Sequence, residues 1–156
     1  MSAAIEVRTA TPTDIPFLVE CNIAMALETE HKRLDRAVLT RGTHAVFDDP
    51  RRGCYLVAER EDGRAGCLLV TYEWSDWRNG EWWWFQSVYV TPRARRCGVF
   101  RSLYAEVERR ARATPGVIGL RLYVERDNTH AQRTYVSLGM EEEPYKMFAR
   151  GFVVFK

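Results

Sequence analysis

The stretch VYVTPRARRCGVF, residues 88–100, passes from an apolar segment through Pro92 into an arginine-rich segment that ends at Gly98. Residues 88–90 predict the end of a strand, because proline has no N–H with which to continue the pairing, and a helix is predicted from about Gly98. The first turn of a helix has backbone N–H groups without intrahelical partners, at the positive end of the helix dipole. The stretch therefore predicts an anion site between a strand and a helix.

The residues around this helix start suit a diphosphate. Gly98 lets a ligand approach the backbone closely because it has no Cβ. Guanidinium groups add fork-shaped donors, from Arg93, Arg95, Arg96 and Arg101. The segment lacks the G-x-G-x-x-G of a dinucleotide fold and the G-K-S/T of a P-loop, which excludes both nucleotide folds. On its residues alone, a phosphate site and a solvated or nucleic-acid-binding basic loop remain alternatives.

Periodicity along the rest of the chain predicts alternating strands and helices. Asn128 is a favourable N-cap for a short helix, and Gly139 is a favourable residue to end it. The predicted elements are a strand at 5–8, helices at about 14–28 and 35–47, strands at 54–58, 65–74 and 81–90, a helix from about 98 to 111, a strand at 118–124, a short helix at about 128–139 and a last hairpin at 145–148 and 152–155. This order predicts an α/β fold with a mixed sheet.

The composition excludes several classes of protein. The chain of 156 residues carries a net charge of only +2, so its bulk electrostatics do not favour a polyanion, and any anion site must be local. No segment approaches the roughly 18 apolar residues that a membrane span needs, and the first residues do not resemble a secretory signal, so a cytoplasmic protein is expected. The cysteines are too widely spaced for a zinc site or a disulfide framework: Cys21, Cys54, Cys67 and Cys97.

Two motifs resemble the GNAT superfamily of N-acetyltransferases. Residues 95–100 are similar to its Q/R-x-x-G-x-G/A signature, and residues 88–92 precede it as the family's fourth strand does. Downstream, a strand–Asn–helix–Tyr–Leu-Gly-Phe/Met pattern is matched by Leu122–Val124, Asn128, Ala131, Tyr135 and Leu138–Met140. The signature ends in Phe100 where Gly or Ala is usual, which is tolerable if this side chain turns inward.

The resemblance implies the fold and the acyl donor. It implies one N-acetyltransferase domain over residues 1–156, with a mixed, mostly antiparallel sheet of six to seven strands, about four flanking helices, and fourth and fifth strands that splay apart. The donor would be acetyl-coenzyme A, with no metal, and its pantetheine arm would pair with the fourth strand. The implied cofactor-binding residues are Val88, Tyr89, Val90, Arg95, Arg96, Cys97, Gly98, Val99, Phe100, Arg101, Asn128, Ala131 and Tyr135.

The resemblance also implies direct acetyl transfer through a tetrahedral oxyanion. Tyr135 occupies the position that protonates the leaving thiolate in many members, and a tyrosine of ordinary pKa, about 10, stays protonated at neutral pH. The alternative is that Tyr135 belongs to an apolar helix stripe. For the acceptor side and its base, Glu28 and Glu73 are the candidates, and Gln86 could orient a water instead.

The acceptor is the part of the reaction that the sequence leaves open. The implied substrate is a primary amine of a small molecule or a free amino group, and neither nucleic acid nor a membrane is expected as a partner. All five tryptophans lie within residues 74–84, and they could line an acceptor pocket or form a homodimer interface. The alternative function is a catalytically silent member that binds coenzyme A as a sensor or assembly module.

Overall fold

The computed structural model describes residues 4–153, which divide into two compact units between Arg121 and Leu122. The first unit contains β1 (Glu6–Thr9), a 3₁₀ turn η1 (Pro12–Asp14), α1 (Ile15–Glu30), α2 (Arg36–Asp48), β2 (Cys54–Arg60), β3 (Gly63–Ser75), β4 (Gly80–Val90), a 3₁₀ turn η2 (Pro92–Ala94), α3 (Val99–Ala113) and β5 (Val117–Arg121). The second unit contains α4 (Thr129–Ser137). Whether the two units form the single domain expected from the sequence stays a prediction.

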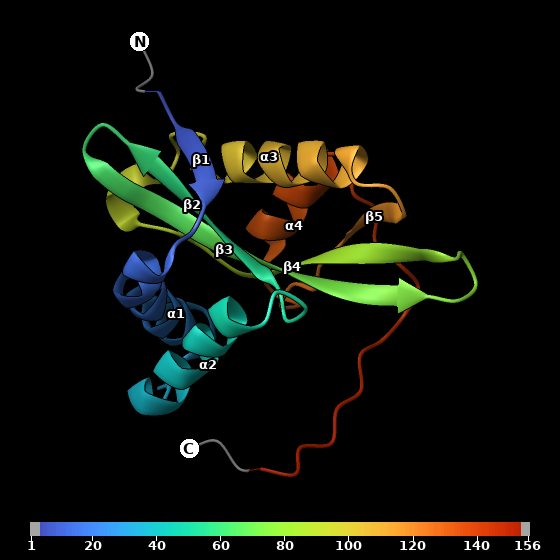
Figure 1. Cartoon of the computed structure of the whole chain (residues 1–156), viewed down its shortest axis with the longest axis horizontal. Helices are drawn as coiled ribbons and strands as arrows, with labels where there is room; N and C mark the ends of the chain where they lie inside the picture. Colours follow the sequence, from blue (N-terminus) through green and yellow to red (C-terminus); the bar gives the residue numbers. More distant parts are fainter. Residues whose placement is uncertain (1–3, 154–156) are drawn as a thin grey trace. The chain divides into compact units, whose positions relative to one another are not determined.

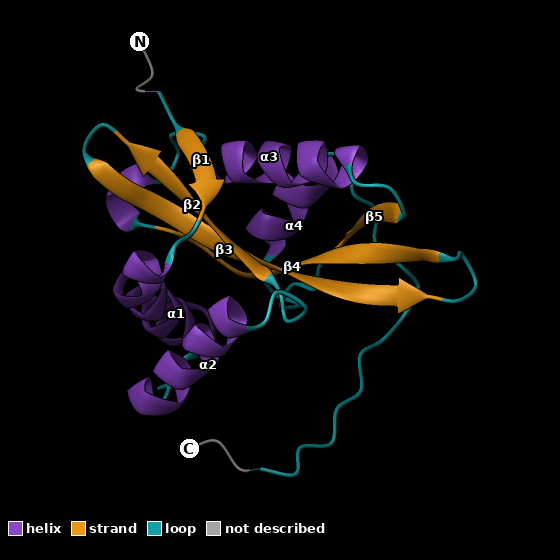
Figure 2. Cartoon of the chain, viewed as in Figure 1, coloured by secondary structure: helices purple, strands orange, loops and turns teal. Residues whose placement is uncertain are grey.

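The sheet has the order β1-β2-β3-β4-β5, so neighbours in the sequence are neighbours in the sheet (Figures 1 and 2). The first four strands pair antiparallel, and β5 pairs with β4 in parallel. Helix α3 supplies the crossover that a parallel pair requires. Figure 1 shows α3 on one face of the sheet and α1 and α2 on the other.

The predicted number of strands was too high, because five strands are observed in the described residues instead of six to seven. The strand predicted to reach residue 124 ends at Arg121, and residues 141–153 form neither a helix nor a strand. Residues 154 and 155 of the predicted last hairpin lie outside the described residues. An alternating pattern forms a strand only beside a hydrogen-bonding neighbour, and α4 is the only helix or strand among the described residues of the second unit.

The helix starts follow from capping residues. The Asp35 carboxylate accepts hydrogen bonds from the N–H groups of Ala37 and Val38 at the start of α2. The Asn128 side chain accepts from the N–H of Ala131, at 3.2 Å, which confirms the predicted N-cap of α4. Both side chains satisfy N–H groups that a first helical turn leaves without intrahelical partners.

Apolar side chains fill both faces of the sheet. On the face of α1, Leu18 and Cys21 pack into one cluster with side chains of the central strands: Tyr55, Val57, Cys67 and Tyr89. On the face of α3, the Tyr104 ring stacks on the Phe85 ring of β4, with centroids 5.3 Å apart. Strand β4 is therefore held between two helix layers over its second half.

A buried carboxylate ties the first strand to this framework. The Asp14 side chain is fully buried, and its oxygens accept from the guanidinium groups of Arg8, at 2.7 and 2.9 Å, and of Arg64, at 2.8 Å. The backbone N–H of Thr11 also donates to it, at 2.8 Å. The hydrogen bonds from Arg8 hold the pKa of Asp14 well below its ordinary value, against the opposing effect of burial.

We expect Asp14→Asn to lower the free energy of unfolding by about 3 kcal/mol at neutral pH, because it removes a buried carboxylate that pairs with two arginines. Arg64 then loses its carboxylate partner, and Arg8 keeps only Glu59. Since the folded pKa is lowered, the contribution of Asp14 is complete above its unfolded pKa of about 4 and is lost as the pH falls below it. Urea unfolding between pH 2 and pH 7 should therefore show a shallower acid slope for the variant. The exposed Asp62, changed to Asn, is the control and should stay within about 0.5 kcal/mol of wild type. Equal losses in both variants would contradict this.

Candidate functional site

Strand β4 contains a bulge in the middle of its second half. The β3–β4 register shifts between Cys67 and Leu69, so that Ser87 and Val88 both lie opposite Leu68. Ser87 has a φ of 51°, in the left-handed region that a non-glycine residue seldom adopts. A bulge bends its strand and leaves backbone groups of the extra residue outside the ladder. The bulge therefore presents backbone hydrogen-bonding groups at one point of β4.

The same part of β4 also lacks a neighbour on its other side. The parallel pairing with β5 runs from Glu81 opposite Val117 to Trp84 opposite Arg121, where β5 ends. Within the first unit, residues 85–90 thus form an open strand edge. The expected separation of the fourth and fifth strands beyond this point stays a prediction, because β5 ends at Arg121 and the residues after it belong to the second unit. An open edge can take an extended ligand as an added strand.

The open edge leads directly into a loop with unpaired N–H groups. Arg96 and Gly98 both have positive φ, 62° and 82°, and the first backbone hydrogen bond of α3 runs from Ser102 N–H to the Gly98 carbonyl. Within residues 4–153, the backbone N–H groups of residues 96–99 form no close, well-aligned hydrogen bond with another backbone group. No other atom lies within 4 Å of where a Gly98 Cβ would stand. This segment, called here the N–H loop (residues 96–99), has the form of an anion site.

Arg95 faces the protein through two of its nitrogens. Its Nη2 donates to Glu28 Oε2 at 2.7 Å, its Nε donates to the Val90 carbonyl at 3.2 Å, and its guanidinium lies 5.5 Å from the centre of the Tyr89 ring. The Tyr89 hydroxyl donates to Glu28 Oε1 at 2.8 Å. The hydrogen bond from Arg95 lowers the pKa of Glu28, with a smaller effect of Tyr89. Burial, and then the hydrogen bond to Glu28, raise the pKa of Tyr89 to about 12.

The other candidates on this loop divide into two groups. Arg93 binds the Asp62 carboxylate and the Arg64 carbonyl, so it faces the β2–β3 turn, whereas Arg96, Cys97 and Arg101 are exposed. Val99 is buried. The Phe100 ring lies against Tyr104, with centroids 6.2 Å apart, which is the inward packing that Phe in place of Gly or Ala requires.

Glu73 lies on β3 beside the last β4–β5 pair. Its Oε1 accepts from Trp84 Nε1 at 3.0 Å and from Arg121 Nη1 at 2.9 Å. The Arg121 guanidinium lies 4.0 Å from the centre of the Trp82 ring. The hydrogen bond from Trp84, and then that from Arg121, lower the pKa of Glu73. Part of the tryptophan cluster therefore orients one half-exposed carboxylate.

The second unit carries the remaining predicted residues on α4. Asn128 caps the helix, Ala131 follows in its first turn, and Tyr135 lies one turn further along. Residues four apart share a face of a helix, so Ala131 and Tyr135 project from the same side of α4. Tyr135 is half-buried, and burial raises its pKa above the ordinary value.

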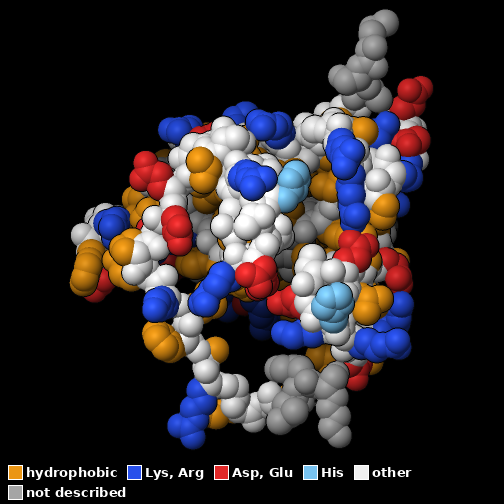
Figure 3. Space-filling model, turned by 180° about the vertical axis from the view of Figure 1, so that it is seen from behind, with side chains coloured by type: hydrophobic (Ala, Val, Ile, Leu, Met, Phe, Trp, Pro, Cys, Tyr) orange, Lys and Arg blue, Asp and Glu red, His pale blue; other side chains and the backbone are white. Residues whose placement is uncertain are grey.

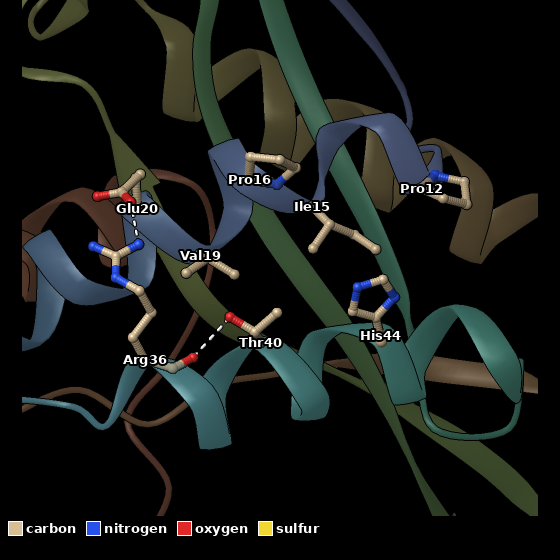
Figure 4. A pocket seen from close by; sticks show the side chains of 8 residues that line it. All are labelled: Pro12, Ile15, Pro16, Val19, Glu20, Arg36, Thr40 and His44. Atoms are coloured by element: carbon tan, nitrogen blue, oxygen red, sulfur yellow. Dashed lines mark hydrogen bonds and ion pairs between the residues drawn. The ribbon is translucent and has the colours of Figure 1, made fainter.

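A pocket of about 450 Å³ lies elsewhere, between α1 with its preceding turn and α2. Figure 4 shows the residues that line it: Pro12, Ile15, Pro16, Val19, Glu20, Arg36, Thr40 and His44. Arg36 forms an ion pair with Glu20 there, and its carbonyl accepts from the Thr40 hydroxyl at 2.7 Å. None of the site residues expected from the sequence contributes to this pocket.

Three observations bear on other kinds of site. Across residues 4–153, no group of three or more His, Cys, Asp or Glu residues could hold a metal ion. None of the helices in this part of the chain is long and apolar enough to cross a membrane. On the face shown in Figure 3, acidic side chains lie among the basic ones.

Sequence reasoning missed the bulge and the contact between Glu28 and Arg95. A glycine or asparagine at position 87 would have signalled a positive φ, but serine carries no such signal. Glu28 and Arg95 are 67 positions apart in the chain, and nothing in either local pattern links them.

The chain matches a family profile and several solved structures. The profile described as "Acetyltransferase (GNAT) family" matches residues 21–140. A possible acetyltransferase from Clostridium difficile 630 is 41% identical, with a TM-score of 0.89, over 96% of this chain and 99% of that one. An aminoglycoside N-acetyltransferase, AAC(6')-Iy, solved in complex with CoA, is 16% identical, with a TM-score of 0.76, over 98% of both chains, and shows the fold alone. A search of curated proteins found no match.

The bulge predicts how position 87 responds to substitution. We expect Ser87→Val to lower the free energy of unfolding by about 2 kcal/mol, because a β-branched residue is strained at positive φ. Ser87→Gly should cost less than about 0.5 kcal/mol, because glycine adopts this conformation without strain. Chemical denaturation of both variants checks this, with Gln86→Val as a control one residue earlier in β4. A valine at 87 that is tolerated as well as glycine would show that the residue does not need a left-handed conformation.

Proposed function

The chain belongs to the acetyltransferase (GNAT) family, and from this premise we propose that it transfers the acetyl group of acetyl-coenzyme A directly to a primary amine of a small molecule or to a free amino group. One observation carries the proposal. The open edge of β4, at residues 85–90, continues into the N–H loop. An extended, amide-containing arm that ends in a diphosphate is the ligand that this combination fits.

Donor binding follows from the backbone. The open edge offers N–H and C=O groups to the amides of the pantetheine arm, as an added strand would use them. The N–H loop at the start of α3 holds the diphosphate, with Arg96 and Arg101 contributing charge. The related fold of AAC(6')-Iy binds CoA, which supports this assignment. Asn128 and Ala131 are proposed as further donor contacts from α4.

The bulge is proposed to stabilise the reacting carbonyl of the thioester. The backbone N–H groups at Ser87 and Val88, where the register of the β3–β4 ladder shifts, would donate to the thioester oxygen as negative charge develops there. Loss of one such donor typically removes about 3 kcal/mol of transition-state stabilisation. A rigid strand between two helix layers keeps these donors in place without reorganisation during the reaction.

Tyr135 is proposed as the acid that protonates the departing thiolate. Because burial raises its pKa, its hydroxyl stays protonated through neutral pH and above. A raised pKa makes it a weaker acid than free tyrosine, but the thiolate needs a proton only as the carbon–sulfur bond breaks. A protein that merely senses coenzyme A has no use for this group.

The proton of the incoming ammonium is proposed to leave through water. Glu28 and Glu73 both have lowered pKa values because arginine or indole groups donate to them. A carboxylate of low pKa is a weak base at neutral pH. Glu73 is proposed as an acceptor-side group, and Gln86 as a residue that orients the water.

The acceptor class can be identified with a thiol-release assay over amines, amino acids, polyamines and aminoglycosides, with acetyl-coenzyme A as donor. Turnover with at least one primary amine, and an N-acetyl product by mass spectrometry, is the expected result. Tight coenzyme A binding without turnover across the whole panel would contradict an enzyme and favour the sensor or assembly module.

We expect Tyr135→Phe to lower kcat by about 100-fold, which is the typical effect of removing a general acid. The Kd for coenzyme A should change less than about twofold. Steady-state kinetics and calorimetry measure the two quantities. The matched control is Tyr145→Phe, at an exposed tyrosine of the same unit, which should leave both unchanged. Equal activity of wild type and Tyr135→Phe would assign Tyr135 to packing.

A further inference from the structure

We propose that Glu28 is a positioning residue that fixes the N–H loop through Arg95, and that Arg95 acts in this clasp rather than as a ligand of the diphosphate. The clasp is defined as Glu28, Tyr89, Arg95 and the Val90 carbonyl. The inference rests on the proposed function, because it assigns a task to residues beside the proposed diphosphate site. It also gives Glu28 a different role from the acceptor-side one expected from the sequence.

Both oxygens of the Glu28 carboxylate have a partner within the protein. Tyr89 donates to one oxygen at 2.8 Å, and Arg95 donates to the other at 2.7 Å. The contacts lower the pKa of Glu28 and raise that of Tyr89 to about 12. At neutral pH the clasp therefore holds one carboxylate, one guanidinium and one neutral phenol. A carboxylate in this state has neither the basicity of a general base nor an oxygen without a partner.

The clasp connects the loop to the core. Glu28 lies in the last turn of α1, a helix whose residues Leu18, Cys21 and Ala26 are buried. Arg95 reaches from the loop to this helix end and, through Nε, to the carbonyl of Val90, the last residue of β4. One side chain therefore joins α1, β4 and the loop. Its Nε and Nη2 donate within the protein, and we assign the diphosphate mainly to the backbone N–H groups of the loop.

The backbone conformation of the residue after Arg95 explains why the loop must be fixed by the clasp. Arg96 has a φ of 62°, and a left-handed conformation costs a non-glycine residue roughly 1 kcal/mol or more. Such a conformation persists only where the residues around it are fixed. Arg95 fixes one side of Arg96, and the start of α3 fixes the other. Release of Arg95 would let Arg96 relax, and the N–H groups of the loop would lose their common direction.

The test uses two acetyl donors, of which only one has a diphosphate. With acetyl-coenzyme A, we expect Glu28→Gln to raise the KM for the donor and the Kd for coenzyme A about tenfold, because a binding loop that is no longer preorganised must be ordered on binding, while kcat stays within twofold. With S-acetylpantetheine, which lacks the diphosphate, kcat/KM should stay within twofold of wild type. The acceptor amine is the one found in the thiol-release assay.

Two further variants keep the result interpretable. Arg95→Lys retains the charge but cannot bridge Glu28 and the Val90 carbonyl together, so it should raise the KM for acetyl-coenzyme A and the Kd for coenzyme A as Glu28→Gln does. In the double variant, these two constants should rise no further than in either single variant. Glu30→Gln is the matched control, because Glu30 is an exposed carboxylate at the same end of α1. It should leave the kinetics with both donors unchanged.

Three outcomes would overturn the clasp. Equal losses with both donors would place Glu28 in the chemistry or the acceptor site, additive losses in the double variant would make Arg95 an independent ligand, and unchanged coenzyme A binding in Glu28→Gln would remove the clasp altogether. If wild type acetylates no amine, the proposed function fails, but calorimetry with coenzyme A still decides whether Glu28 and Arg95 act together.

Discussion

The structure depends on the fact that β4 has different neighbours along its length. Near Gly80 it pairs with β3 on one side and β5 on the other, whereas beyond Trp84 one edge has no strand beside it in the first unit. The backbone groups of this edge need hydrogen-bond partners, since unpaired groups away from water are costly. Helices on both faces of the sheet keep this edge of β4 straight enough to bind a ligand. The bulge at Ser87 directs some of the backbone hydrogen-bonding groups of the edge toward one point.

The loop after β4 continues the same principle. Its N–H groups at residues 96–99 form no close backbone hydrogen bond in the described chain. Arg96 in a left-handed conformation, Gly98 and the start of α3 hold them in place. Charged side chains next to the loop stabilise this backbone site. Arg93 and Arg95, which the sequence suggests as phosphate donors, form ion pairs with Asp62 and Glu28. The arginine content of the loop therefore reflects its attachment to the protein as much as its charge.

The end of β4 and the start of α3 were predictable from residues 88–100, because proline, glycine and the apolar spacing each act locally. The cap at Asn128 was readable for the same reason. The bulge was not, because serine has no preference for positive φ, and the Glu28–Arg95 contact depends on how distant segments pack. The last hairpin was predicted wrongly over residues 145–148, because an alternating pattern does not say whether a neighbouring strand is present.

In the proposed function, backbone N–H groups rather than arginine side chains are the central binding elements. A ¹⁵N–¹H correlation spectrum titrated with acetyl-coenzyme A tests this most directly. The largest amide shifts, and the strongest slowing of amide exchange, should occur at residues 87–90 and 96–99. Unchanged amides at both segments, with shifts confined to other parts of the chain, would contradict a donor site built on the β4 edge and the loop.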